Sequence, residues 1–235
     1  MSEIKIIPVG GRSVYVEICK DISLECNRRV HALYYKLKEL SGVEEVVPAY
    51  SSLLLIYDPL TIGYKDLRDK IEDLAAQEGV VELKPRKFKI PVVYGGEYGP
   101  DMKLVIEKTG LSEDEVIKIH TSKVYTCYML GFTPGFVYLG DVDDRIAVPR
   151  LPTPRVKIPP GSVGIAGKQT GWYGVESPGG WVLIGRTPVV TFNPNKDPPS
   201  FIRPGDKVEF YRISEDEYRE IHEKSLKGEY EVKPE

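Results

Sequence analysis

From residue 131 to residue 192 a glycine or proline interrupts the chain every few residues, which restricts what this half of the chain can fold into. Proline lacks the backbone donor that a helix needs, so helices do not persist at this density. Between the interruptions lie short runs rich in β-branched residues: SVGIA, WVLIG and VVTFN. The sequence therefore predicts a barrel or sandwich of short strands, with further strands over residues 88–94, 123–130 and 207–213.

Two S-x-x-E capping boxes open helices in the same half of the chain: Ser112 with Glu115, and Ser214 with Glu217. The first box predicts a helix that ends near His120. The second predicts a terminal helix to about residue 226, on which His222 is expected to be exposed.

The first 84 residues predict a different architecture. Alternating or apolar runs predict strands over 14–18, 43–48, 52–57 and 80–83. Apolar spacings of three and four predict helices over 24–40 and around Leu67, Ile71 and Leu74. The order β-α-β-β-α-β is ferredoxin-like and leaves one sheet face for a partner or a second domain. His31 is expected to be a structural histidine.

The segment Lys-Pro-Arg-Lys at 84–87 interrupts both patterns and is predicted to be the linker. The expected fold class is therefore α+β, with a ferredoxin-like domain over 1–84. A β-barrel domain with a helical insert and a C-terminal helix is expected over 85–235.

Composition excludes several classes of protein. A net charge of −3 with dispersed Lys and Arg argues against nucleic acid as a partner. No run approaches the roughly 18 apolar residues of a membrane span, and the N-terminus does not resemble a secretory signal. Few Asn and Gln among many Lys and Glu are typical of proteins from hot environments.

Three cysteines are scattered without a CxxC pair: Cys19, Cys26 and Cys127. This spacing indicates neither a disulfide framework nor a zinc site. The expectation is buried, unpaired thiols in a reducing cytoplasm.

Familiar catalytic motifs are missing from the chain. Gly167-Lys168 resembles the end of a phosphate loop, but Gln169 replaces the hydroxyl residue that binds magnesium. There is no G-x-S-x-G and no HExxH, and the three histidines are dispersed, so no metal site is predicted.

What remains is a dense set of Gly, Pro, Arg and aromatic residues after His120. Proline-braced arginines suit carboxylates and phosphates, glycine turns expose N–H donors, and aromatic rings exclude water. His120 is the candidate proton donor or acceptor. The candidate anion-binding and loop residues are Arg150, Arg155, Arg186, Gln169, Gly131, Phe132, Pro134, Gly135, Phe136, Ser177, Gly179, Gly180 and Trp181. Alternatively, the glycines and prolines only shape barrel turns, and the aromatic residues, which also include Tyr138, Trp172 and Tyr173, only fill the core.

The motifs of this region resemble one family: the B-type subunit of 5-oxoprolinase, also called allophanate hydrolase subunit 1 or the sporulation-kinase inhibitor family. The resemblance rests on His120, GF-x-PGF-x-YLG (131–140), VPR-x-x-TPR (148–155), IPPGSVGIAG (158–167), Gln-Thr-Gly (169–171) and SPGGW-x-x-IGRTP (177–188).

The resemblance implies a cyclophilin-like barrel. It also implies a complex with a C-type subunit, which is similar to allophanate hydrolase subunit 2, and with a third 5-oxoprolinase subunit. That complex opens 5-oxo-L-proline to L-glutamate and uses ATP. On this hypothesis the arginines bind the small anionic substrate, His120 moves a proton, and the turns at 131–135 and 177–180 stabilise an oxyanion.

Two alternatives stay open. The family includes inhibitors of sensor histidine kinases, so the chain is alternatively a protein that binds a kinase. A carboxyltransferase module of a biotin enzyme, related to urea carboxylase, is a further alternative, although the chain holds no biotin-carrier or carboxylase segment.

Overall fold

The computed structural model describes residues 4–77 and 85–235. The chain divides into two compact units, Met1–Lys84 and Pro85–Glu235. Among the described residues, no helix has both the length and the apolar character that crossing a membrane requires.

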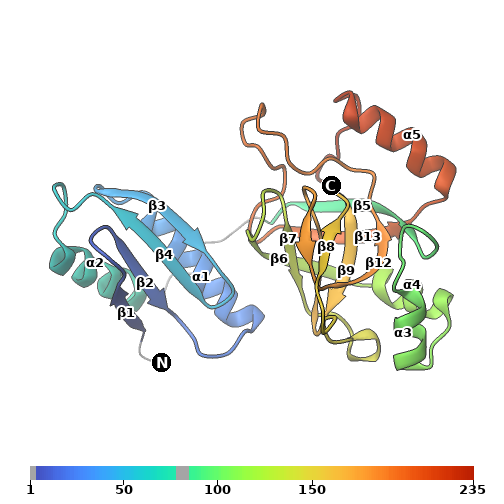
Figure 1. Ribbon diagram of the computed structural model, residues 1–235. Helices are drawn as coiled ribbons and strands as arrows, with labels where there is room; N and C mark the ends of the chain where they lie inside the picture. The colour runs from blue at the N-terminus through green and yellow to red at the C-terminus, as the bar shows by residue number, and fades with distance from the viewer. Residues whose placement is uncertain (1–3, 78–84) are drawn as a thin grey trace. The chain divides into compact units, whose positions relative to one another are not determined.

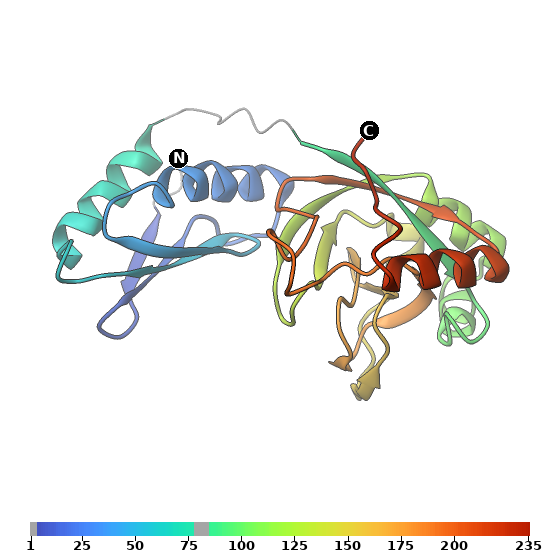
Figure 2. The same cartoon turned by 90° about the horizontal axis from the view of Figure 1, so that it is seen from above.

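The first unit is one sheet covered by two helices (Figure 1). Its strands run antiparallel in the order β1-β2-β4-β3, and both helices lie on the same side of the sheet (Figure 2). The Ser23 side chain accepts a hydrogen bond from the Cys26 N–H and so caps the first helix. The elements are β1 (Lys5–Pro8), β2 (Ser13–Glu17), α1 (Leu24–Leu37), β3 (Val43–Pro48), β4 (Ser52–Tyr57) and α2 (Tyr64–Ala76).

The edge strand β1 was not predicted. It has only four residues and one proline, and it is held by its hairpin with β2, whose turn contains Gly10 in the left-handed region (φ 68°). The strand predicted over 80–83 lies outside the described residues. Helix α1 ends at Leu37, three residues before its predicted end.

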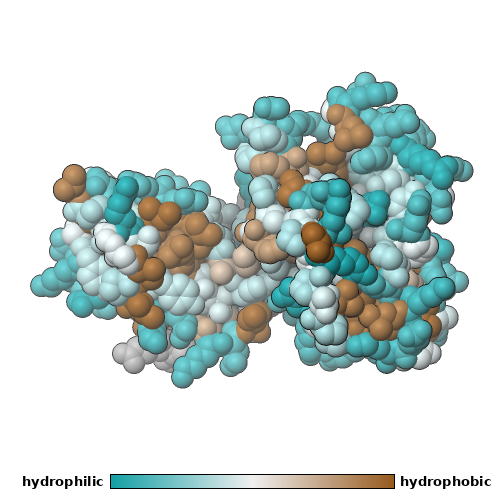
Figure 3. Space-filling model, viewed as in Figure 1, coloured by the Kyte–Doolittle hydropathy of each residue, from teal (hydrophilic) through white to brown (hydrophobic). Residues whose placement is uncertain are grey.

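The two faces of this sheet differ in what covers them. Val14, Val16, Leu53 and Leu55 are fully buried and pack with the helices. His31 on α1 is also buried, as expected of a structural histidine. On the other face a row of cross-strand neighbours runs through Ile7, Tyr15, Leu54 and Val47. Figure 3 shows apolar side chains on this face.

The cysteine prediction was wrong for two of the three residues. Cys19 and Cys26 form a disulfide, with their Cα atoms 6.1 Å apart. The turn between β2 and α1 folds the strand end onto the first helical turn, a proximity that spacing in the sequence does not reveal. The argument for a reducing compartment from unpaired cysteines therefore loses its basis. Cys127 is buried and unpaired.

The second unit is a closed seven-stranded barrel in the order β10-β7-β6-β13-β5-β12-β9, with a separate pair, β8 and β11. Strands β5 and β13 come from opposite ends of the unit and run parallel (Figures 1 and 2). Its elements are β5 (Lys87–Tyr94), α3 (Met102–Thr109), α4 (Glu113–Thr121), β6 (Val124–Leu130), β7 (Val137–Gly140), η1 (Asp144–Ile146), β8 (Arg155–Ile158), β9 (Ser162–Ala166), β10 (Gln169–Trp172), β11 (Ser177–Gly179), β12 (Val182–Arg186), β13 (Lys207–Arg212) and α5 (Glu215–Leu226).

The predicted α+β class with a C-terminal barrel is confirmed, as are both capping boxes. Three local predictions were wrong. The run VVTFN is not a strand, and its Phe192 makes only an isolated bridge to Ser200. The linker predicted over 84–87 is too long, because Lys87 already begins β5 and the Arg86 guanidinium is bound to Asp206 at 2.5 Å. His222 is half-buried rather than exposed, since its ring lies against the Pro188 carbonyl, 3.2 Å from Nδ1.

Alternate residues of the barrel strands form two separate apolar clusters. One is the main core and includes Trp172 and Phe210. The other contains Phe136, Tyr173 and Trp181, and the β8–β11 pair contributes Ile158 to it. Trp172 ends β10 and Tyr173 follows it directly, yet the two residues belong to different clusters.

Candidate functional site

His120 lies in the main core rather than at a surface. Helix α4 ends there, and the imidazole is 0% exposed. Its ring stacks on Phe210 with centroids 4.7 Å apart. Nδ1 lies 2.8 Å from the Tyr94 hydroxyl, and Nε2 lies 2.9 Å from Thr170 Oγ1.

The hydrogen bonds define the tautomer of His120. Thr170 has one hydroxyl proton, which it donates to the Gly164 carbonyl at 2.9 Å. Thr170 Oγ1 must therefore accept from His120, which places the imidazole proton on Nε2. The Nδ1 lone pair then accepts the proton of the Tyr94 hydroxyl. Both nitrogens are satisfied, and the ring links α4, β5 and β10.

The expectation that His120 titrates near neutrality was therefore wrong. Burial lowers the pKa of His120 from 6.5 to about 3, because the charged imidazolium would lose its hydration. A neutral imidazole with both nitrogens engaged has no proton to exchange with a substrate. The role that this geometry supports is structural.

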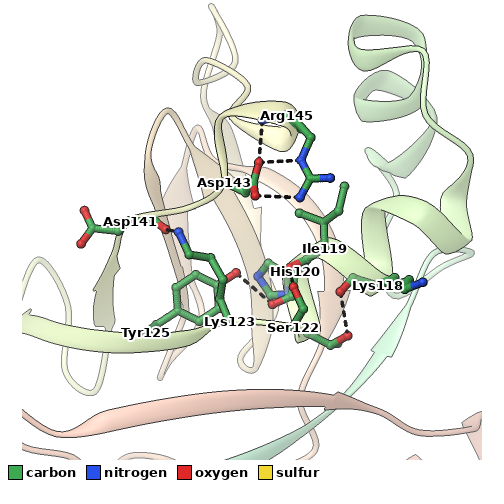
Figure 4. A network of polar contacts seen from close by, with 10 residues as sticks. Lys118, Ile119, His120, Ser122, Lys123, Tyr125, Asp141, Asp143 and Arg145 are labelled. Atoms are coloured by element: carbon green, nitrogen blue, oxygen red, sulfur yellow. Dashed lines mark hydrogen bonds and ion pairs between the residues drawn. The ribbon is translucent and has the colours of Figure 1, made fainter.

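The surroundings of His120 are also committed to local bonds (Figure 4). The Tyr125 hydroxyl donates to the His120 carbonyl at 2.9 Å, and Lys123 donates to the Asp141 carbonyl. Asp143 accepts from both the backbone and the guanidinium of Arg145, which holds the pKa of that carboxyl well below its usual range. This network joins the end of α4 to the strands that follow it.

The aromatic residues of the second apolar cluster are Phe136, Tyr138, Tyr173 and Trp181, and we call them the aromatic wall. Phe136 packs against the other three rings, with centroid distances of 4.5 Å to Tyr138, 4.7 Å to Tyr173 and 5.2 Å to Trp181. Phe132 extends the wall into solvent. Its side chain is 62% exposed, its ring lies edge-on to Phe136, and its backbone is in the left-handed region (φ 65°).

Arg150 is the exposed cation beside the aromatic wall. Burial raises the pKa of Tyr138, and the positive charge of Arg150 acts against that rise. A Cβ added to Gly180 would lie 3.7 Å from Arg150 Nη2, so the guanidinium passes next to that backbone. Arg150 makes no ion pair within residues 4–77 and 85–235.

Arg155 lies close to the same wall but is paired. Its Nη2 is 2.5 Å from Asp101 Oδ1. It stands opposite Gly179 in the β8–β11 register, and a Cβ on that glycine would lie 2.2 Å from the Tyr173 hydroxyl oxygen. Burial raises the pKa of Tyr173, and among the opposing influences are the Trp181 backbone and the charges of Arg150 and Arg155. The structure thus brings Arg150 and Arg155 to one ring.

Arg186 has other neighbours. Its guanidinium lies over the Tyr98 ring, 5.5 Å from the centroid. Burial raises the pKa of Tyr218, and the positive charge of Arg186 acts against that rise. Gln169 lies at the end of β10 away from Tyr173. The predicted grouping of Arg186 and Gln169 with the other two arginines therefore finds no support in these contacts.

In the glycine turn at 131–136, backbone N–H groups donate to carbonyl groups of the same turn. Gly131 N donates to Phe136 O, Thr133 N to Gly131 O, and Phe136 N to Thr133 O. These amides were candidates for an oxyanion hole, and their internal bonds argue against that role. Pro134 is exposed, and Gly135 (φ 70°) packs against Phe192.

Two further predicted residues belong to the β8–β11 region. Ser177 is buried, and its hydroxyl has no hydrogen-bond partner among the described residues. Trp181 is buried within the aromatic wall. Two residues outside the motifs, Asp101 and Tyr94, hold Arg155 and His120. Neither lies in the Gly/Pro-rich segment, and no local pattern marked them.

The segment that resembled the end of a phosphate loop is a hairpin turn. Gly167 and Lys168 form the hairpin turn between β9 and β10. Lys168 is paired with Asp144 at 2.8 Å. We therefore assign no phosphate contact to this turn.

Comparisons with known proteins agree with this fold. Residues 4–202 match the family of the carboxyltransferase domain, subdomains C and D. This match defines the class of protein.

A relative places the chain more narrowly. This chain is 43% identical over 235 residues to the B-type subunit of 5-oxoprolinase from Bacillus subtilis. The alignment covers 94% of this chain and 98% of the relative. The chain belongs to the family of B-type 5-oxoprolinase subunits.

Solved structures agree with this assignment. A conserved uncharacterized protein from Pyrococcus horikoshii is 51% identical, with a TM-score of 0.56 over 91% of this chain and all of that one. The urea amidolyase of K. lactis is 21% identical, with a TM-score of 0.82 over 99% of this chain and 16% of that protein. The second likeness is one of fold alone.

Proposed function

We propose that this chain is the B-type subunit of a 5-oxoprolinase complex. In this proposal it acts with a C-type subunit and a third subunit, and the complex uses ATP to open 5-oxo-L-proline to L-glutamate. Support comes from the relative of that name, which matches over nearly its whole length. ATP supplies the driving force to the complex, and no step of its use is assigned to a residue of this chain.

The observation that carries the proposal is Arg150 beside the aromatic wall. The substrate is a small five-membered lactam with one carboxylate. An exposed guanidinium suits the carboxylate, and the rings of Phe132 and Tyr138 suit the apolar edge of the lactam. Opening the ring adds water across the amide: the carbonyl carbon gains the hydroxyl oxygen, and the nitrogen gains a proton as the C–N bond breaks.

His120 is not part of this proposal, because its imidazole is enclosed and both nitrogens are bonded. The proton that the ring nitrogen gains must come from another group. The function of this chain in the proposal is to bind and orient the substrate.

Reconstitution with the two partner proteins tests the proposal. Glutamate release from 5-oxoproline is measured with and without ATP, and ATP-dependent release is expected. Absence of release from an assembled complex would overturn the proposed function.

Arg150→Ala tests the site within the same assay. Loss of a charge-assisted bond to a carboxylate is expected to raise KM roughly 10- to 100-fold. Arg219→Ala is the matched control, since Arg219 is an exposed arginine on α5. An unchanged KM for Arg150→Ala would remove this residue from the site.

The kinase-inhibitor alternative stays a prediction. Co-purification of the chain with the dimerisation domain of a sensor histidine kinase, rather than with a homologue of the C-type subunit, would favour it.

A further inference from the structure

Asp101 is a buried carboxylate that does not do what its position suggests. It is the N-cap residue of α3, where an aspartate side chain commonly accepts from the helix backbone. No such bond is present. Instead its Oδ2 accepts from Leu183 N at 2.7 Å and its Oδ1 accepts from Arg155 Nη2 at 2.5 Å. Asp101 N also donates to Leu183 O at 3.0 Å, so both the backbone and the side chain of the residue are fixed to β12.

The Arg155 guanidinium is only half used by this pair. Nη2 is bound to Asp101, whereas Nη1 is buried and has no hydrogen-bond partner among the described residues. The side chain as a whole is 31% exposed, so the group stands near solvent. A buried donor without an acceptor is unfavourable, and an oxygen of a bound anion would satisfy it.

The position of Arg155 places this donor beside the aromatic wall. Gly179 faces Arg155 across the β8–β11 pair and contacts the Tyr173 hydroxyl. The next residue, Gly180, lies against Arg150 Nη2. The buried two-residue segment Gly179-Gly180 therefore lies beside both arginines.

We propose that Asp101 is a positioning residue, which holds Arg155 so that Nη1 and Arg150 together bind the carboxylate of a monoanionic ligand. This inference rests on the proposed function and adds a positioning residue to its site. The two arginines and the aspartate carry a net charge of about +1, because Asp101 offsets one of the guanidiniums. One net positive charge matches a ligand with a single carboxylate better than it matches a dianion.

The test uses the reconstituted assembly and the variant Asp101→Asn. An asparagine keeps an acceptor for Leu183 N but removes the charge that orients Arg155. We expect KM for 5-oxoproline to rise roughly tenfold, with a smaller change in kcat. Glutarate, a five-carbon dianion, should lose less affinity than 5-oxoproline does, because the variant site carries one more positive charge. The ratio of the glutarate Ki to the KM for 5-oxoproline should therefore fall several-fold.

The control is Asp143→Asn, which removes a partly exposed carboxylate paired with Arg145. It should leave KM and the glutarate ratio unchanged. A purely structural role of Asp101 predicts a lower Tm with an unchanged KM and an unchanged ratio. That result would overturn the inference.

Arg155→Lys provides an independent variant if Asp101→Asn does not fold. It keeps the positive charge but loses the second nitrogen of the fork, so KM should rise by a similar factor. An unchanged KM would again overturn the inference. If the wild-type assembly releases no glutamate, the proposed function itself fails and this inference falls with it, whereas an active wild type with unresponsive variants refutes the inference alone.

Discussion

At the scale of single residues, the environment of a side chain decides its chemistry more than its type does. His120 was the natural candidate for proton transfer because an unperturbed imidazole titrates near neutrality. In the barrel core it is a neutral link between Tyr94 and Thr170. Its burial could not be predicted from the helix pattern alone, because His120 follows Ile119, which is also buried, at the end of α4.

The buried imidazole makes stability depend on pH. Its pKa is about 3 when folded and about 6.5 in the unfolded chain. Between these values the unfolded state binds a proton that the folded state does not. The free energy of unfolding should therefore fall as pH decreases from about 6.5 toward 3, by at most about 1.4 kcal/mol per pH unit from this group.

Urea unfolding of His120→Gln between pH 4 and 7 checks this prediction. The variant should be less stable than wild type at pH 7 and should show a flatter pH dependence, by up to one proton. Tyr94→Phe keeps the buried imidazole, so it should lower stability while retaining the slope. Equal slopes for wild type and His120→Gln would contradict the assignment.

At the scale of elements, patterns that repeat along the chain were good predictors. Two short β-type runs joined by a turn located β3 and β4 at their observed bounds, and the S-x-x-E signals located α4 and α5. Elements defined by their partners were missed. Strands β8 and β11 have four and three residues and contain or follow prolines, so only their pairing with each other marks them as strands.

The Cys19–Cys26 disulfide is also defined by a partner rather than by a local pattern. It predicts that reduction lowers the stability of the first unit. The bridge closes a loop with a sequence separation of 7. For a loop of this size, the chain-entropy account gives a stabilisation of about 2–3 kcal/mol. Reduction should lower the Tm of the first unit by roughly 10 °C.

Thermal unfolding with and without a reductant measures this effect. The double variant Cys19→Ser, Cys26→Ser is the control, and its Tm should be the same with and without the reductant. If the wild type were equally insensitive to the reductant, the bridge would contribute no stability.

At the scale of the whole molecule, the sequence located the candidate site in the second half of the chain. It did not show which side chains face the main core and which belong to the aromatic wall. Trp172 and Tyr173 are adjacent, yet one belongs to the main core and the other to the aromatic wall. Which side each residue faces depends on the register of β10 against β7 and β9. That register is set by pairing with distant strands and cannot be read from composition. For the same reason the sequence grouped Arg186 with Arg150 and Arg155.

Closure of the barrel depends on a contact between residues 120 positions apart. Asp206 precedes β13, and its side chain is 6% exposed. It accepts from Arg86 Nη2 at 2.5 Å and from the backbone N–H groups of Arg86 and Arg203, which ties the start of β5 to the start of β13.

Asp206→Ala leaves the Arg86 guanidinium without its partner and two backbone donors without an acceptor. We expect a loss of about 3 kcal/mol, measured by urea unfolding of the second unit. Asp143→Ala breaks an ion pair with the exposed Arg145 and should cost far less. Equal losses for the two variants would mean that burial of the Arg86–Asp206 pair adds nothing to the closure of the barrel.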